Sequence, residues 1–68
     1  MELTINHQKK VFKEHLPSLE ALLAREASPL PKGIAVALNN QVIPRSRWAS
    51  QELQPNDNIL IITATQGG

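Results

Sequence analysis

The residues with the clearest chemical potential are the last two of the sequence, Gly67 and Gly68. Glycine adds nothing to a core and loses more conformational freedom on folding than any other residue. The glycine pair therefore has two interpretations. It is a frayed chain end, where glycine is common, or it is a reactive tail whose terminal carboxylate is unhindered because neither residue has a Cβ. The rest of the chain has to distinguish these two interpretations.

Other side chains capable of chemistry lack the partners that their chemistry needs. The sequence has no Cys, which excludes a disulfide, a thiolate zinc site and a catalytic thiol. His7 and His15 have no His or Glu at helical ligand spacing, so we expect surface histidines rather than metal ligands. Ser18 has no apparent base beside it, and a helix cap explains it better than a nucleophile does.

Arg45 and Trp48 form a second candidate site. Arg45 follows the rigid Pro44, and its guanidinium could bind a carboxylate or nucleotide of a partner through two hydrogen bonds. The alternative is a surface ion pair with Glu52 or Asp57. Trp48 is either an interface residue or, as we favour, a packing residue in a core that has few other large side chains.

Length and charge narrow the class of protein. A chain of 68 residues makes one domain with a thin core. Seven Lys and Arg against six Asp and Glu give no basic excess, and Phe12 and Trp48 are too few aromatics to stack on bases, so we expect no nucleic-acid partner. The start of the chain has no apolar signal-peptide region, and the longest apolar run, 59–62, cannot span a bilayer. We therefore expect a cytoplasmic protein without a membrane partner.

The first half of the chain predicts a hairpin followed by a helix. Leu3 and Ile5 alternate with polar residues, and after a turn over residues 6–9 a second short strand begins at residue 10. Pro17 and Ser18 open a helix that ends near residue 27. One face of this helix is apolar, and its residues are Leu16, Leu19, Leu22 and Leu23.

The second half predicts the remaining strands. Residues 34–38 alternate as a strand, Asn39-Asn40 suits a tight turn, and residues 41–43 return as a short strand that Pro44 ends. A helical turn over 45–50 and a turn over 54–58 precede the final strand, 59–65. This strand is apolar on both faces, as a central strand parallel to the first one would be. We therefore predict an α+β fold of the β-grasp (ubiquitin-like) type, a single domain over 1–68 in which a mixed sheet of four to five strands packs on one helix and a flexible Gly-Gly tail follows.

Over nearly its whole length, and most strongly over residues 33–68, the sequence resembles the ThiS family, the sulfur carriers of thiamine biosynthesis. The residues that carry the resemblance are Ala37, Leu38, Asn39, Val42, Pro44, Arg45, Trp48, Leu53, Asp57, Ile59, Gly67 and Gly68. One departure is Asn56 before Asp57, where the family often has Gly; Asn also tolerates a positive φ. The sulfur carriers of molybdopterin synthase share the fold and the Gly-Gly end, but they are longer, so we keep them as the alternative.

The resemblance implies a chemistry for the tail. A ThiF-type adenylating enzyme would use MgATP to convert the Gly68 carboxylate to an acyl-adenylate, and a persulfide supplied through a cysteine desulfurase would turn it into a thiocarboxylate. Thiazole synthase (ThiG) would then take the sulfur. The chain would be a protein cosubstrate rather than an enzyme, with no bound cofactor or metal, and Gln66, Gly67 and Gly68 would thread into a narrow channel of the partner.

A flexible tail needs a second binding surface to supply affinity. One helix covers only one face of a sheet, so we expect this surface on the other face, near Ile59, Ile61 and the strand 34–38, with Arg45 and Trp48 as further contacts. Two other functions remain open: conjugation of the C-terminus to a lysine, and a β-grasp binding module without C-terminal chemistry.

Overall fold

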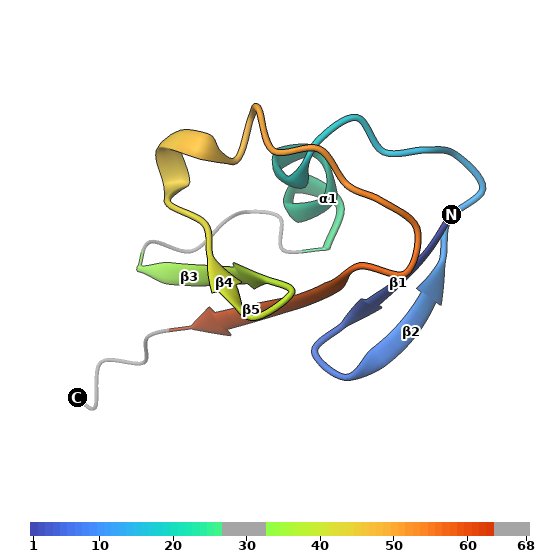
Figure 1. Ribbon diagram of the computed structural model, residues 1–68, viewed down its shortest axis with the longest axis horizontal. Helices are drawn as coiled ribbons and strands as arrows, with labels where there is room; N and C mark the ends of the chain where they lie inside the picture. Colours follow the sequence, from blue (N-terminus) through green and yellow to red (C-terminus); the bar gives the residue numbers. More distant parts are fainter. Residues whose placement is uncertain (27–32, 64–68) are drawn as a thin grey trace.

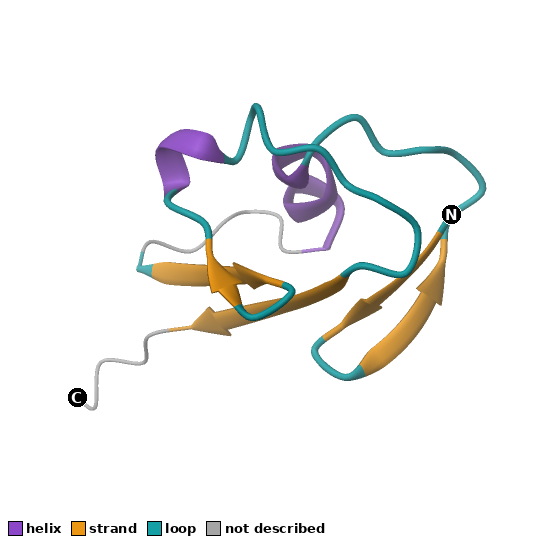
Figure 2. Ribbon diagram, viewed as in Figure 1, coloured by secondary structure: helices purple, strands orange, loops and turns teal. Residues whose placement is uncertain are grey.

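The computed structural model describes residues 1–26 and 33–63. Five strands in this part of the chain form one sheet with the order β2-β1-β5-β3-β4 (Figure 1). The elements, in chain order, are β1 Glu2–Ile5, β2 Gln8–Val11, α1 Leu19–Glu26, β3 Ile34–Leu38, β4 Gln41–Val42, the 3-10 turn η1 Arg45–Arg47 and β5 Asn58–Thr63. The helix α1 lies over one face of the sheet (Figure 2). No helix in these residues is long and apolar enough to cross a membrane.

Strand β5 lies in the middle of the sheet, as its apolar sequence predicts. It runs parallel to β1, with Thr4 opposite Asn58, and antiparallel to β3, with Ile34 opposite Thr63. Because β5 has a neighbour on each side, it is the strand that joins the two hairpins into one sheet. The mixed five-stranded sheet with one helix confirms the predicted β-grasp fold; residues 64 and 65 of the predicted final strand lie outside the described residues.

Two tight asparagine turns set the registers of the hairpins. Asn39 and Asn40 have φ angles of 50° and 71°, which confirms the turn predicted there. Asn6 and His7 have nearly the same angles, 50° and 69°. The first turn is therefore shorter than the four residues predicted, and β2 begins at Gln8 rather than at residue 10. The prediction was wrong here because all four residues of β2 are exposed, so no alternation of apolar and polar residues marks where the strand begins.

The first turn of α1 is capped from two directions. The Ser18 hydroxyl oxygen accepts the backbone N–H three residues later at 3.1 Å, which confirms its predicted capping role. The N–H groups of Leu19 and Glu20 donate to the carbonyls of Gln51 and Trp48, at 2.8 and 3.1 Å. The segment after η1 is thus fixed to the helix, because it satisfies donors that a helix cannot satisfy itself.

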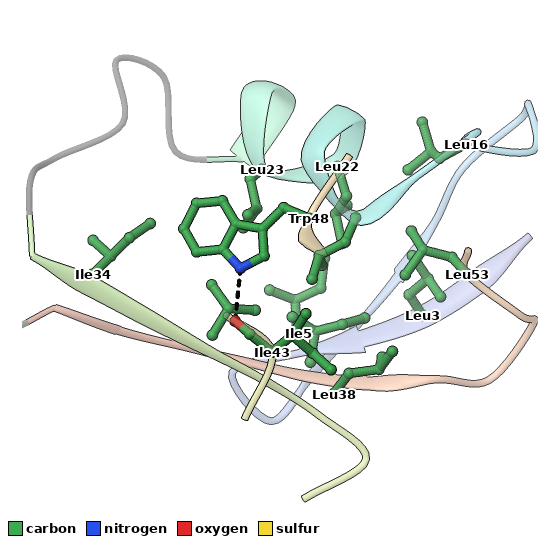
Figure 3. Close-up of a cluster of buried hydrophobic side chains, with 13 residues drawn as sticks. Leu3, Ile5, Leu16, Leu22, Leu23, Ile34, Leu38, Ile43, Trp48 and Leu53 are labelled. Atoms are coloured by element: carbon green, nitrogen blue, oxygen red, sulfur yellow. Dashed lines mark hydrogen bonds between the residues drawn. The ribbon is translucent and has the colours of Figure 1, made fainter. Parts of the chain in front are cut away.

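The core lies between α1 and the sheet, and Trp48 is its largest member (Figure 3). Its side chain is only 2% exposed, and its indole N–H donates to the Ile43 carbonyl at 2.8 Å. The cluster comprises Leu3, Ile5, Leu16, Leu19, Leu22, Leu23, Ile34, Val36, Leu38, Ile43, Trp48, Leu53 and Ile59. The predicted apolar face of the helix and the predicted packing role of Trp48 are both confirmed.

Candidate partner-binding surface and tail

The reactive tail predicted from the sequence follows directly from the central strand. β5 ends at Thr63, and the residues Gln66, Gly67 and Gly68 lie outside the described residues. Five residues connect Thr63 to the end of the sequence, and they can span at most about 17 Å when fully extended. Any partner that acts on Gly68 must therefore come close to the carboxyl end of β5.

The expectation that Ile59 and Ile61 line the exposed sheet face is wrong. Ile59 is fully buried in the core, and Ile61 is partly buried and packs against the same core. They pair with Leu38 and Val36, which also face the helix. Side chains alternate along a strand, so the correct exposed positions of β5 are the neighbouring ones.

The uncovered sheet face instead carries an apolar cluster that we call the open-face patch: Ala35, Ala37, Val42, Leu60 and Ile62. The register places Ile62 opposite Ala35, and Leu60 opposite Ala37, which in turn lies opposite Val42. Val42 is 67% exposed and Ile62 is 54% exposed. Ala35 is also exposed and Leu60 is partly buried, whereas Ala37 is only 7% exposed and forms the floor of the patch between Leu60 and Val42. In β3 the alternation of large side chains with alanines shows which side chains face the helix, but the phase of β5 also requires its register with β3.

Arg45 covers the aromatic ring of Trp48. Its guanidinium carbon lies 4.7 Å from the ring centroid, within the range of a cation–π interaction. The ion pairs among the described residues are Lys10–Glu26 and Arg25–Glu14, so the alternative pairing of Arg45 with Glu52 or Asp57 is wrong. Trp48 itself is too buried to contact a partner directly, which corrects its place among the expected contact residues.

Asp57 stabilises the turn that leads into β5. Its carboxylate oxygens accept hydrogen bonds from the Asn39 side-chain amide at 2.9 Å and from the Gln54 backbone N–H at 2.8 Å. Asn39 Oδ1 in turn accepts the Asn58 N–H at 2.9 Å. Asn56 has a φ of 72°, so asparagine occupies a left-handed position there, where related sequences were expected to have glycine. Both carboxylate oxygens of Asp57 therefore accept hydrogen bonds that hold this turn in place.

The other chemical candidates have ordinary surroundings. His7 and His15 are exposed, as predicted. Within residues 1–26 and 33–63, no three His, Asp or Glu side chains gather in a way that could hold a metal ion. The part of the chain that the structure describes therefore brings together one apolar patch, one stacked arginine and the strand that leads to the glycines.

The comparisons with known proteins agree with one another. The family model of the ThiS family matches residues 2–68. The sulfur carrier protein ThiS of Escherichia coli K12 is 40% identical over 50 residues, which make up 74% of this chain and 68% of that protein. The crystal structure of the thiamine biosynthesis protein ThiS from Geobacter metallireducens has a TM-score of 0.85 and 20% identity, with 100% of both chains covered, and so shares the fold. The resemblance inferred from the residues is confirmed, and the chain belongs to the ThiS family.

Proposed function

We propose that the chain is a sulfur carrier protein of thiamine biosynthesis and that Gly68 is the residue that carries the sulfur. The observation that carries this proposal is the family match, which extends through Gly67 and Gly68. The E. coli relative bears the name of a sulfur carrier protein. The position of β5 supports the same function, because the strand that leads to the glycines is the central strand of the sheet.

The proposed chemistry begins with activation of a carboxylate. A free carboxylate is a poor electrophile, so a ThiF-type enzyme transfers AMP from MgATP to the Gly68 carboxylate and releases pyrophosphate. The terminal sulfur of a persulfide, supplied through a cysteine desulfurase, attacks the acyl carbon, and AMP leaves. A thiol then attacks the distal sulfur of the acyl disulfide. This attack breaks the S–S bond and releases the Gly68 thiocarboxylate. The attacking thiol is then joined in a disulfide to the sulfur of the group that had carried the persulfide. Thiazole synthase (ThiG) is the proposed acceptor.

In this sequence of steps the chain contributes the reacting carboxylate and no catalytic side chain. Gly67 and Gly68 have no Cβ, so the tail fits a narrow channel and the acyl carbon is open to attack from both faces. The protein is therefore a cosubstrate of its partner enzymes rather than an enzyme. MgATP belongs to the adenylating enzyme and not to a site on this chain.

The open-face patch is the proposed docking surface for the adenylating enzyme. Leu60 and Ile62 belong to the strand that continues into the tail, so an enzyme that holds Gly68 lies close to both. Apolar area of this kind can supply the affinity that an extended tail lacks. We expect Ile62→Asp to weaken binding of the enzyme by about tenfold or more, because it places a charge in an apolar contact.

The control for this variant is Val11→Asp. Val11 is 77% exposed but lies on β2, at the far edge of the sheet from β4. Affinity measured by titration calorimetry should be unchanged in Val11→Asp. Equal loss in both variants, or no loss in Ile62→Asp, would contradict the proposed docking surface.

The function itself is tested by the intact mass of the protein after incubation with MgATP, cysteine, a cysteine desulfurase, a thiol and the cognate adenylating enzyme. We expect a mass gain equal to the replacement of one oxygen by sulfur, and no gain when Gly68 is deleted. An enzyme that is active on another carrier but leaves this chain unchanged would favour a β-grasp binding module instead.

A further inference from the structure

The chain carries Arg45 toward the end of the sheet at which β5 ends. The Ile43 N–H donates to the Val36 carbonyl at 2.9 Å, so the chain after β4 continues antiparallel to β3, toward its first residue. That first residue, Ile34, pairs with Thr63, the last residue of β5. Arg45 comes two residues after Ile43, in η1, which lies toward the same end of the sheet as the last residue of β5 but on the side that α1 covers (Figure 1).

The guanidinium of Arg45 is held in place by the ring beneath it. Trp48 is fixed by its burial and by its hydrogen bond to the Ile43 carbonyl, and the guanidinium carbon lies 4.7 Å from its ring centroid. Pro44, with a φ of −61°, sets the start of the turn. A guanidinium that stacks on a ring keeps its N–H donors in its own plane, where a carboxylate can accept two of them.

No acidic side chain in the described part of the chain forms an ion pair with these donors. All six Asp and Glu side chains of the sequence belong to residues 1–26 and 33–63. The ion pairs within these residues use Glu14 and Glu26, and Asp57 is occupied by Asn39 and the Gln54 N–H. A pre-oriented cation toward the end of the sheet at which β5 finishes is thus available to an anionic group outside the described part of the chain.

We propose that Arg45 binds a carboxylate side chain of the adenylating enzyme at the mouth of the channel that receives the tail. This inference rests on the proposed function. We favour a carboxylate over a nucleotide phosphate as the group that binds Arg45. The nucleotide becomes attached to Gly68, which can lie up to about 17 Å from Thr63 when the tail is extended. Arg45 stays on the folded domain, at the mouth of the channel. Its role is to position the carrier, and it takes no part in the chemical step.

The test compares three variants in steady-state assays of carrier-dependent pyrophosphate release by the cognate enzyme. Arg45→Met keeps an unbranched side chain over the ring and removes the donors. Arg45→Lys keeps the charge and removes the planar fork. Arg47→Met is the matched control, since it removes the same charge from the same turn, and Arg47 has no ring contact among the described residues.

We expect Arg45→Met to raise the KM for the carrier about tenfold with kcat unchanged, Arg45→Lys to give a smaller rise, and Arg47→Met to change KM less than about twofold. The KM of the unmodified carrier should rise with salt more steeply than that of Arg45→Met. Melting temperatures of all variants separate binding from folding. If Arg45 only packs on Trp48, the KM of Arg45→Met equals that of Arg47→Met, which overturns the proposal.

A fall in kcat with unchanged KM would also overturn it, because that result indicates contact with the reacting nucleotide. If the proposed function is wrong, the result is different. An enzyme that is active on another carrier then releases no pyrophosphate when it is given the unmodified chain. In that case the Arg45 proposal fails together with the function on which it rests.

Discussion

Two isoleucines of β5, Ile59 and Ile62, should respond to the same substitution to different extents. Ile59 is fully buried, so Ile59→Val removes a methyl group from the core and leaves a small cavity. The expected loss is about 1 kcal/mol in the free energy of unfolding. Ile62 is 54% exposed on the open-face patch, and Ile62→Val should change this free energy by less than about 0.5 kcal/mol. Valine is the right replacement because a domain of this size has a total stability of only roughly 3–10 kcal/mol, and a larger truncation at Ile59 could unfold it.

Urea denaturation followed by circular dichroism measures both variants. With a slope of about 1 kcal/mol per molar urea, Ile59→Val should lower the midpoint by roughly 1 M and leave the slope unchanged. The melting temperature should fall by about 5 °C. Ile62→Val should keep the midpoint of the unmodified protein. Equal shifts in the two variants, or a larger shift in Ile62→Val, would refute the assignment of the two side chains to opposite faces of the sheet.

Three further changes test the contacts that hold the domain together. Trp48→Phe removes the donor to the buried Ile43 carbonyl and leaves a smaller ring in the core, so it should lower the free energy of unfolding by about 3 kcal/mol in urea titrations followed by circular dichroism. A double-mutant cycle of Asn39→Ala and Asp57→Ala should show a coupling of about 1–2 kcal/mol; a coupling near zero would mean that this hydrogen bond adds nothing. Ser18→Ala should cost about 1 kcal/mol through loss of the helix cap, and Ser18→Asp, which keeps an acceptor, should recover most of it in thermal melts.

The sequence was sufficient for the fold because its local signals agree with one another. Leucines at helical spacing, an apolar final strand and two asparagines between short strands all favour one helix on one mixed sheet. The turn at Asn6 and His7 was less predictable, because nothing local in the sequence indicates that a histidine adopts a φ of 69°. That conformation depends on the pairing of β1 with β2 around it.

The candidate site was predicted less completely than the fold. A strand that is apolar on both faces does not reveal which face the helix covers, so Ile59 and Ile61 were assigned to the wrong one. The phase depends on the pairing with β3, which is a long-range contact. The stacking of Arg45 on Trp48 was not predicted either. The sequence places the two residues three positions apart, but it does not show that the face of the ring meets the guanidinium.

The central position of β5 also determines how the domain responds to mechanical force. A pull on the residues after Thr63 acts along the axis of β5, whose ladders with β1 and β3 lie on either side of it. Ladder hydrogen bonds run across the strands, so such a force loads many of them together in shear rather than opening them one at a time. A protease or unfolding machine that grips this end meets first a strand that is paired on both sides. The strand that leads to the glycines proposed to react is therefore also a poor starting point for unfolding the domain.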